Sequence, residues 1–150
     1  MKKLIGLLLL LPLAGAEPAG YKYWSAAELK SLAKPLANKS NAITSSDNLG
    51  NFGRDHALMV HRDGSGVGEL HETEADVMVV VSGTGTLMVG GTMPGSKKTA
   101  PGEVRAPSVV GGVKQPIGPG DILHIAPKTP HQVLLEPGKQ ITYFTLKVKE

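Results

Sequence analysis

The chain has 150 residues, with 16 lysines and arginines, 13 aspartates and glutamates, and no cysteine. That length is enough for one ordinary domain, and a chain without cysteine has no disulfides, thiolate nucleophiles or cysteine-ligated metal sites. Setting aside Lys2 and Lys3 leaves 14 basic residues against 13 acidic ones, and no Lys/Arg-rich run with interleaved aromatic residues occurs, so we expect no nucleic-acid partner.

Residues 1–16 have the three parts of a secretory signal peptide. Lys2 and Lys3 precede an apolar run, Leu4–Leu11, and residues 14–16 form an A-x-A cleavage pattern. The run is too short to cross a bilayer as a helix, and a buried N-terminal helix, the alternative, would normally carry polar residues on one face. We therefore expect export to the periplasm or secretion from the cell. A lipoprotein anchor needs a cysteine just after the signal, so we expect no membrane anchor.

A short helix is predicted near the start of the segment at 17–53. Ser25 stands three residues before Glu28, which is the spacing of a capping box, where a hydroxyl and a carboxylate each satisfy a backbone N–H at the start of a helix. A loose apolar stripe follows. We predict a helix over 26–33, which Pro35 limits because proline disfavours helix at the residue before it.

The rest of the chain, residues 54–150, is predicted to be one β domain, preceded by a polar, glycine-containing loop at 38–53. Short runs rich in valine and isoleucine alternate there with turn residues, which indicates an antiparallel sandwich or barrel. The segment at 90–107 is expected to be an irregular insertion between two strands. The predicted strands are His56–His61, Gly66–His71, Asp76–Val81, Gly85–Val89, Ser108–Lys114, Asp121–Ile125, Gln132–Leu135 and Gln140–Lys149.

Two separated stretches carry candidate metal ligands. Glu69 and His71 are two residues apart, so in a strand they share a face. Asp76 opens the next strand, which we expect to return antiparallel beside the first, so that the three side chains converge inside a barrel. Far downstream, a Pro-Gly-Asp turn at 119–121 starts a short strand, and a second turn brings the chain back at His131. Carboxylate oxygen and imidazole nitrogen are suitable ligands for transition metals.

The first stretch resembles the first motif of the cupin superfamily, G-x5-H-x-H-x3–4-E-x6-G. His71 falls on the second histidine of this pattern and Gly83 on its closing glycine. Glu69 stands in place of the first histidine, Asp76 stands in place of the glutamate, and the opening glycine, Gly64, is offset by one residue.

The second stretch resembles the second cupin motif, G-x5-P-x-G-x2-H-x3-N. Gly120 falls on the glycine and His131 on the metal-binding histidine. Ala126, Lys128 and Leu135 replace the proline, the second glycine and the asparagine of the pattern.

The resemblance covers residues 56–147 and implies the fold and a metal site. The implied fold is an antiparallel double-stranded β-helix, or jelly-roll barrel. The implied cofactor is one divalent transition metal (Mn, Fe, Ni, Cu or Zn), with Glu69, His71, Asp76 and His131 as the candidate ligand set. Each candidate has a structural alternative: the histidines and Asp76 can stabilise turns, and Glu69 can be an exposed strand carboxylate.

The resemblance leaves the reaction open. Cupins include dioxygenases, isomerases, lyases and decarboxylases, so we expect a metal-dependent enzyme on a small molecule without choosing among these. The alternatives are a non-catalytic module that binds a small ligand with or without metal, and a structural barrel that lost its site. A homodimer is a further expectation from the resemblance.

Three residues are candidates for acid–base work beside the metal. His124 shares a strand face with Ile122 that we expect to look into the barrel, Tyr143 on the last strand is expected to line the same cavity, and Glu74 lies close to the first motif. The sequence contains no G-x-S-x-G elbow, no phosphate-binding glycine loop before a helix and no H-E-x-x-H pattern, so no other chemistry competes.

Overall fold

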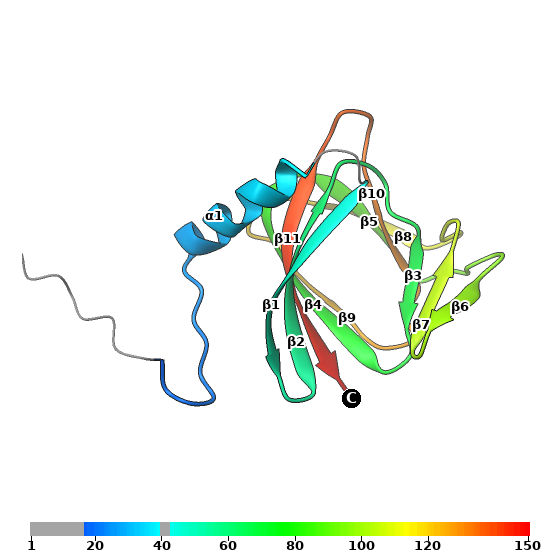
Figure 1. Ribbon diagram of the computed structural model, residues 1–150. Coiled ribbons are helices and arrows are strands. Elements are labelled where there is room, and N and C mark those ends of the chain that lie inside the picture. Colours follow the sequence, from blue (N-terminus) through cyan, green and yellow to red (C-terminus); the bar gives the residue numbers. More distant parts are fainter. Residues whose placement is uncertain (1–16, 40–42) are drawn as a thin grey trace, which may run out of the picture.

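The computed structural model describes residues 17–39 and 43–150, which form one helix and eleven strands (Figure 1). The expected signal peptide at 1–16 lies outside the described residues. No helix within the described part of the chain is long and apolar enough to cross a membrane. The elements are α1 (Ala26–Ala37), β1 (Thr44–Phe52), β2 (Asp55–Arg62), β3 (Gly68–His71), β4 (Glu74–Gly83), β5 (Gly85–Val89), β6 (Lys97–Ala100), β7 (Glu103–Ala106), β8 (Val113–Ile117), β9 (Ile122–Ile125), β10 (His131–Leu134) and β11 (Ile141–Lys149).

The strands form two antiparallel sheets that face each other (Figure 1). One sheet has the order β1-β2-β11-β4-β9 and the other has the order β6-β7-β3-β10-β5-β8. From β2 to β5 each successive strand changes sheet, and the same alternation recurs from β8 to β11. This path is that of a double-stranded β-helix. It confirms the predicted all-β barrel with a short N-terminal helix.

An apolar core fills part of the space between the sheets. On β4, Met78 and Val80 are buried in this core, and Asp76 is buried on the same strand face because side chains two residues apart point the same way. The strands that build the core therefore also direct polar groups inward. The core residues are Val60, Met78, Val80, Leu87, Ile117, Ile125, Val133, Ile141 and Tyr143.

The helix α1 packs on the outer face of the five-stranded sheet, against β1, β2, β4 and β11 (Figure 1). The hydroxyl of Ser25 accepts a hydrogen bond from the backbone N–H of Glu28 at 3.1 Å, as the capping pattern predicts. The helix continues past Pro35 to Ala37, so the predicted end near residue 33 is wrong. Proline removes a backbone hydrogen bond, but the extra turn buries Leu36 completely, and burial of a leucine contributes about 1.5–3 kcal/mol.

The loop predicted at 38–53 is wrong over residues 44–52, which form β1. β1 is an edge strand that pairs with β2 alone, and a bulge between Asn48 and Gly50 shifts its register. The side-chain oxygen of Asn48 accepts a hydrogen bond from the Gly50 N–H at 2.8 Å. A polar edge strand is solvated on one side and lacks the apolar alternation on which the prediction rested.

The irregular insertion predicted at 90–107 is also wrong in part, because β6 and β7 lie within it and form the edge of the six-stranded sheet. Both strands have only four residues, and every residue of β6 is exposed, so no inward apolar face marks β6 in the sequence. The strand predicted at 108–114 begins later, at Val113.

The expected pairing of β3 with β4 is wrong. β3 pairs with β7 and β10, whereas β4 pairs with β11 and β9 in the opposite sheet. Asp76 therefore meets His71 from the facing sheet rather than from a neighbouring strand. The convergence of the two motifs comes from the closure of the barrel.

Candidate metal and small-molecule site

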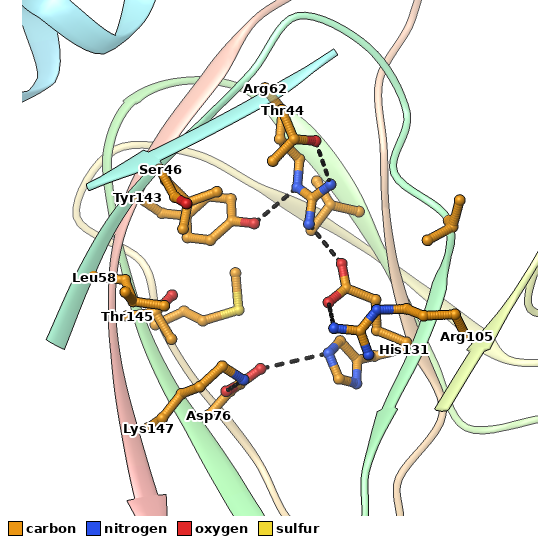
Figure 2. A pocket seen from close by; sticks show the side chains of 15 residues that line it. Thr44, Ser46, Leu58, Arg62, Asp76, Arg105, His131, Tyr143, Thr145 and Lys147 are labelled. Atoms are coloured by element: carbon orange, nitrogen blue, oxygen red, sulfur yellow. Dashed lines mark hydrogen bonds and ion pairs between the residues drawn. The ribbon is translucent and has the colours of Figure 1, made fainter. Parts of the chain in front are cut away.

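A cavity of about 340 Å³ lies between the sheets and contains most of the predicted site residues (Figure 2). Its volume falls within the range of small-molecule sites, about 300–1,000 Å³. Its apolar wall consists of Leu58, Val60, Val67, Met78 and Val133. Its polar lining comes from both sheets and comprises Thr44, Ser46, Arg62, Glu69, Asp76, Arg105, His131, Tyr143, Thr145 and Lys147.

Both candidate histidines are buried and are held through the same ring nitrogen. The Nδ1 atom of His71 lies 2.8 Å from a carboxylate oxygen of Glu103, and the Nδ1 atom of His131 lies 3.0 Å from the backbone carbonyl oxygen of Thr129. Because ionised carboxylates and carbonyls only accept hydrogen bonds, each Nδ1 carries the proton. In the neutral rings the lone pairs therefore lie on the Nε2 atoms, as in histidines that bind metals.

The two Nε2 atoms converge on Asp76 in the opposite sheet. Its Oδ2 atom lies 3.2 Å from Nε2 of His71 and 3.5 Å from Nε2 of His131. The backbone of the turn before His131 is also tied to β3, because the N–H of Lys128 donates to the carbonyl of His71 at 2.7 Å. Lys128 has φ 61°, so it adopts the left-handed conformation at the place where the cupin pattern has glycine.

The arrangement fits a divalent ion for three of the four predicted ligands. Among the described residues, Glu69, His71 and His131 each offer a donor atom, and these atoms all lie within 4.8 Å of one another. Two imidazoles and one carboxylate suit a first-row transition metal. This group of residues could hold an ion. Asp76 is not part of this group, although it contacts both histidines.

Asp76 is instead paired with Lys147, a residue that sequence analysis did not single out. The Nζ atom of Lys147 lies 2.6 Å from Oδ1 of Asp76 (Figure 2). It also lies 2.9 Å from Nε2 of His71. Burial raises the pKa of Asp76, but its close contacts with the His131 and His71 rings and the charge of Lys147 outweigh it, so the pKa lies far below its usual value. Asp76 is therefore an ionised carboxylate in the folded protein.

The neighbours of His71 shift its pKa in opposite directions. Burial and the charge of Lys147 lower this pKa, but interactions with Asp76 and Glu103 outweigh them and raise it above its usual value. The contact between Lys147 and Nε2 of His71 nevertheless requires a lone pair on one of the two nitrogens. Because Nδ1 of His71 faces Glu103, we assign this lone pair to Nε2, which accepts a hydrogen bond from the ammonium of Lys147.

Glu69 also lines the cavity and is held there by two arginines, Arg62 and Arg105. One of its oxygens lies 2.6 Å from Nη2 of Arg62, and the other lies 3.4 Å from Nη2 of Arg105. Burial raises the pKa of Glu69, but the two arginine charges outweigh it and hold the pKa below its usual value. Arg62 also donates to the hydroxyl oxygens of Tyr143 at 2.8 Å and Thr44 at 2.9 Å. Burial raises the pKa of Tyr143 to about 12, so its phenol stays protonated.

The other acid–base candidates lie outside the cavity lining. His124 is exposed, and Ile122 on the same face is 73% exposed, so the expectation that this face looks into the barrel is wrong. The reason is register: His124 pairs with Val77, whose neighbours Asp76 and Met78 point inward. Glu74 is half-buried and does not line the cavity.

Sequence analysis missed several residues of the site, five of which bear directly on its chemistry. Lys147 and Thr145 follow Tyr143 at two-residue intervals on β11, so strand periodicity from Tyr143 could have found them. The others are partners whose positions depend on the pairing of strands far apart in the chain. They are Arg62, Glu103 and Arg105.

Comparison with known structures agrees with the chain path described above. No protein-family model and no curated protein matches the sequence. An uncharacterised conserved protein with a double-stranded β-helix domain from Klebsiella pneumoniae is similar with a TM-score of 0.58 and 13% identity, over 86% of this chain and 90% of that protein. The fold is that of the cupins.

Two further structures share this fold. A cupin-2 domain from Rhodospirillum rubrum has a TM-score of 0.52 and 16% identity, over 72% of this chain and 61% of that one. A sugar phosphate isomerase of the cupin superfamily from Silicibacter pomeroyi has a TM-score of 0.52 and 16% identity, over 72% of this chain and 60% of that one. This chain thus spans less than two thirds of the length of either protein.

Proposed function

We propose that this chain is a metal-dependent cupin enzyme that acts on a small polar molecule in the barrel cavity. A divalent transition metal, one of Mn, Fe, Ni, Cu and Zn, would be held by Glu69, His71 and His131. The observation that carries this proposal is the common orientation of the two histidines, whose Nδ1 atoms face acceptors while their Nε2 atoms meet inside the barrel. This is the arrangement that outer hydrogen bonds impose on metal-binding histidines.

The residues around the proposed metal define what the site offers a substrate. A bound metal would polarise a substrate oxygen or activate water. Within the described part of the chain, the hydroxyl of Thr145 is buried without a hydrogen-bond partner, and it can bind a polar substrate group. Tyr143 keeps its proton because of its raised pKa and is a hydrogen-bond donor rather than a base. Lys147, which is paired with Asp76 in the cavity lining, can donate a hydrogen bond to a polar substrate group.

A non-catalytic module that binds a small ligand is the second candidate. The observation that favours it is the mutual pairing of the cavity charges, Arg62 with Glu69 and Lys147 with Asp76. A site whose charged groups neutralise one another can hold a ligand without transforming it. An oxygen-uptake screen of the metal-loaded protein tests whether it is a dioxygenase. Catalytic turnover in this screen would exclude the non-catalytic binding module.

Metal binding is tested by replacing the histidines one at a time. Protein purified without a chelating tag should bind one divalent ion per chain, and His71→Ala or His131→Ala should weaken binding by more than about 10-fold, since changing even an outer partner of a ligand costs 10–100-fold. His124→Ala is the matched control, because His124 is exposed outside the cavity. Metal analysis and thermal shifts with each of the five metals measure the effect. No thermal shift of the wild-type protein with any of them would contradict the proposal.

We also propose that the chain is exported and cleaved after residue 16. Lys2, Lys3, the apolar run Leu4–Leu11 and the A-x-A pattern at 14–16 support this. Mass spectrometry of protein from the periplasm or medium of a bacterial host should find Glu17 as the first residue. An intact Met1 terminus there would refute cleavage.

A further inference from the structure

We propose that Lys147 is an intramolecular competitor for the metal and sets how tightly the site binds it. This inference rests on the proposed metal site at Glu69, His71 and His131. The lysine ammonium and a divalent cation would use the same nitrogen of His71 and the same carboxylate of Asp76. The site would then be occupied either by the Lys147 ammonium or by a metal ion.

Strand register directs Lys147 into the site. β11 pairs with β4 so that Lys147 lies directly opposite Asp76. The lysine side chain is only 14% exposed, lines the cavity and follows Tyr143 and Thr145 along the inner face of β11. Its Nζ atom lies 2.6 Å from Oδ1 of Asp76 and 2.9 Å from Nε2 of His71.

The competition follows from the number of lone pairs on His71. Its Nδ1 atom is committed to Glu103 at 2.8 Å, so Nε2 has the one lone pair that the ring can offer. That lone pair accepts a hydrogen bond from the ammonium of Lys147 or binds a metal, but it cannot do both. A divalent ion at Nε2 would also face the ammonium charge at short range inside a partly buried cavity, where like charges repel more strongly than in water.

Asp76 gives a second reason why Lys147 would weaken metal binding. Its Oδ2 atom already lies 3.2 Å and 3.5 Å from the two imidazole Nε2 atoms, but the Lys147 charge neutralises the carboxylate. Removing that charge would free Asp76 to join the metal. The four-ligand set suggested by the motif positions would then be complete, with two imidazoles and two carboxylates.

The test compares Lys147→Met with the wild type and with Lys149→Met. Methionine keeps an unbranched side chain but has no charge, and Lys149 is an exposed lysine two residues further along β11. Dissociation constants for Zn²⁺ and Mn²⁺ alone are measured on chelator-stripped protein by competition with a metal-sensitive dye. We expect Lys147→Met to bind at least about 10-fold more tightly than the wild type, the lower end of the effect of outer partners on metal affinity. Lys149→Met should stay within about 2-fold of the wild type, because exposed charges are screened.

A second variant tests whether the unpaired Asp76 carboxylate in Lys147→Met disturbs the fold. Lys147→Met leaves the Asp76 carboxylate without its lysine, so Lys147→Met combined with Asp76→Asn removes both charges and keeps the three remaining donors. This double variant should also bind metal more tightly than the wild type, and circular dichroism should show the same β spectrum for all variants.

The outcomes separate this inference from the proposed function. If the wild type binds metal and neither Lys147 variant binds more tightly, the competition is refuted while the metal site stands. If the Lys147 variants bind and the wild type does not, the competition is supported and the metal requirement of the wild-type enzyme is wrong. If none of them binds either metal, both proposals are overturned.

Discussion

Replacing Arg62 by methionine should lower the free energy of unfolding by about 3–5 kcal/mol, the usual cost of removing one partner of a buried ion pair. The guanidinium of Arg62 is buried and serves three acceptors at once, Glu69, Tyr143 and Thr44. Methionine fills similar space but leaves the Glu69 carboxylate with the longer contact to Arg105 alone. The loss comes mainly from a buried charge that has lost its partner.

A second substitution separates this cause from lost packing. If the unpaired carboxylate is responsible, Arg62→Met combined with Glu69→Met should be more stable than Arg62→Met alone, since hydrophobic replacement of both members of a buried pair is often neutral. Arg54→Met is the control on an exposed arginine in the turn between β1 and β2, and it should change stability by less than about 0.5 kcal/mol.

Urea unfolding followed by circular dichroism measures these four proteins and the single variant Glu69→Met, with equal m-values required for the comparison. A double variant that loses the sum of the two single effects would show that Arg62 and Glu69 do not stabilise each other. Glu69 would then be held by the barrel itself, and its role as a metal ligand would not depend on Arg62.

The fold was predictable because it depends on a repeated local pattern. Short Val- and Ile-rich runs between turn residues mark most of the central strands, and β5 was predicted with its observed bounds, Gly85–Val89. The pattern fails at β1, β6 and β7, which lie at or next to sheet edges and carry polar or exposed residues. At an edge, solvent replaces the neighbouring strand, so the sequence is free of the apolar alternation that prediction needs.

Only those residues of the candidate site that belong to a sequence motif could be predicted. His71 and His131 are recognisable by spacing, but their hydrogen-bond partners come from strand pairing. Glu103 faces His71, and Arg105 faces Glu69, because β7 pairs with β3 in one particular register. Lys147 meets Asp76 through the register of β11 with β4. Such contacts join residues up to about half the chain apart, and no local pattern encodes them.

These partners change the chemistry that the motif alone suggests. The four motif positions predict a carboxylate-rich metal site, whereas Arg62, Arg105 and Lys147 bring three positive charges into the cavity lining. Glu69 and Asp76 are then counterions of this chain's own cations as well as candidate ligands. How strongly Glu69 and Asp76 can bind a metal therefore depends on how easily these three positively charged side chains move away from them.

Gly83→Ala should have an effect of similar size on stability, a loss of about 2–5 kcal/mol, and it tests the register that brings Asp76 to Lys147. Gly83 ends β4 with φ 75°, a left-handed conformation that costs a residue with a Cβ about 1–2 kcal/mol. A Cβ there would also overlap the backbone carbonyl of Gln140 in the segment leading into β11, and overpacking adds about 1–3 kcal/mol.

Gly53→Ala isolates the steric part of this effect. Gly53 has the same φ of 75°, but a Cβ there would meet nothing within 4 Å. Urea unfolding should therefore show that Gly83→Ala loses at least about 1 kcal/mol more than Gly53→Ala. Because β4 and β11 are paired from Gly83 to Glu74, relief of the overlap by a shift of β4 would also move Asp76 relative to Lys147. Equal losses in the two variants would mean that the barrel absorbs the extra methyl group without disturbing this pairing.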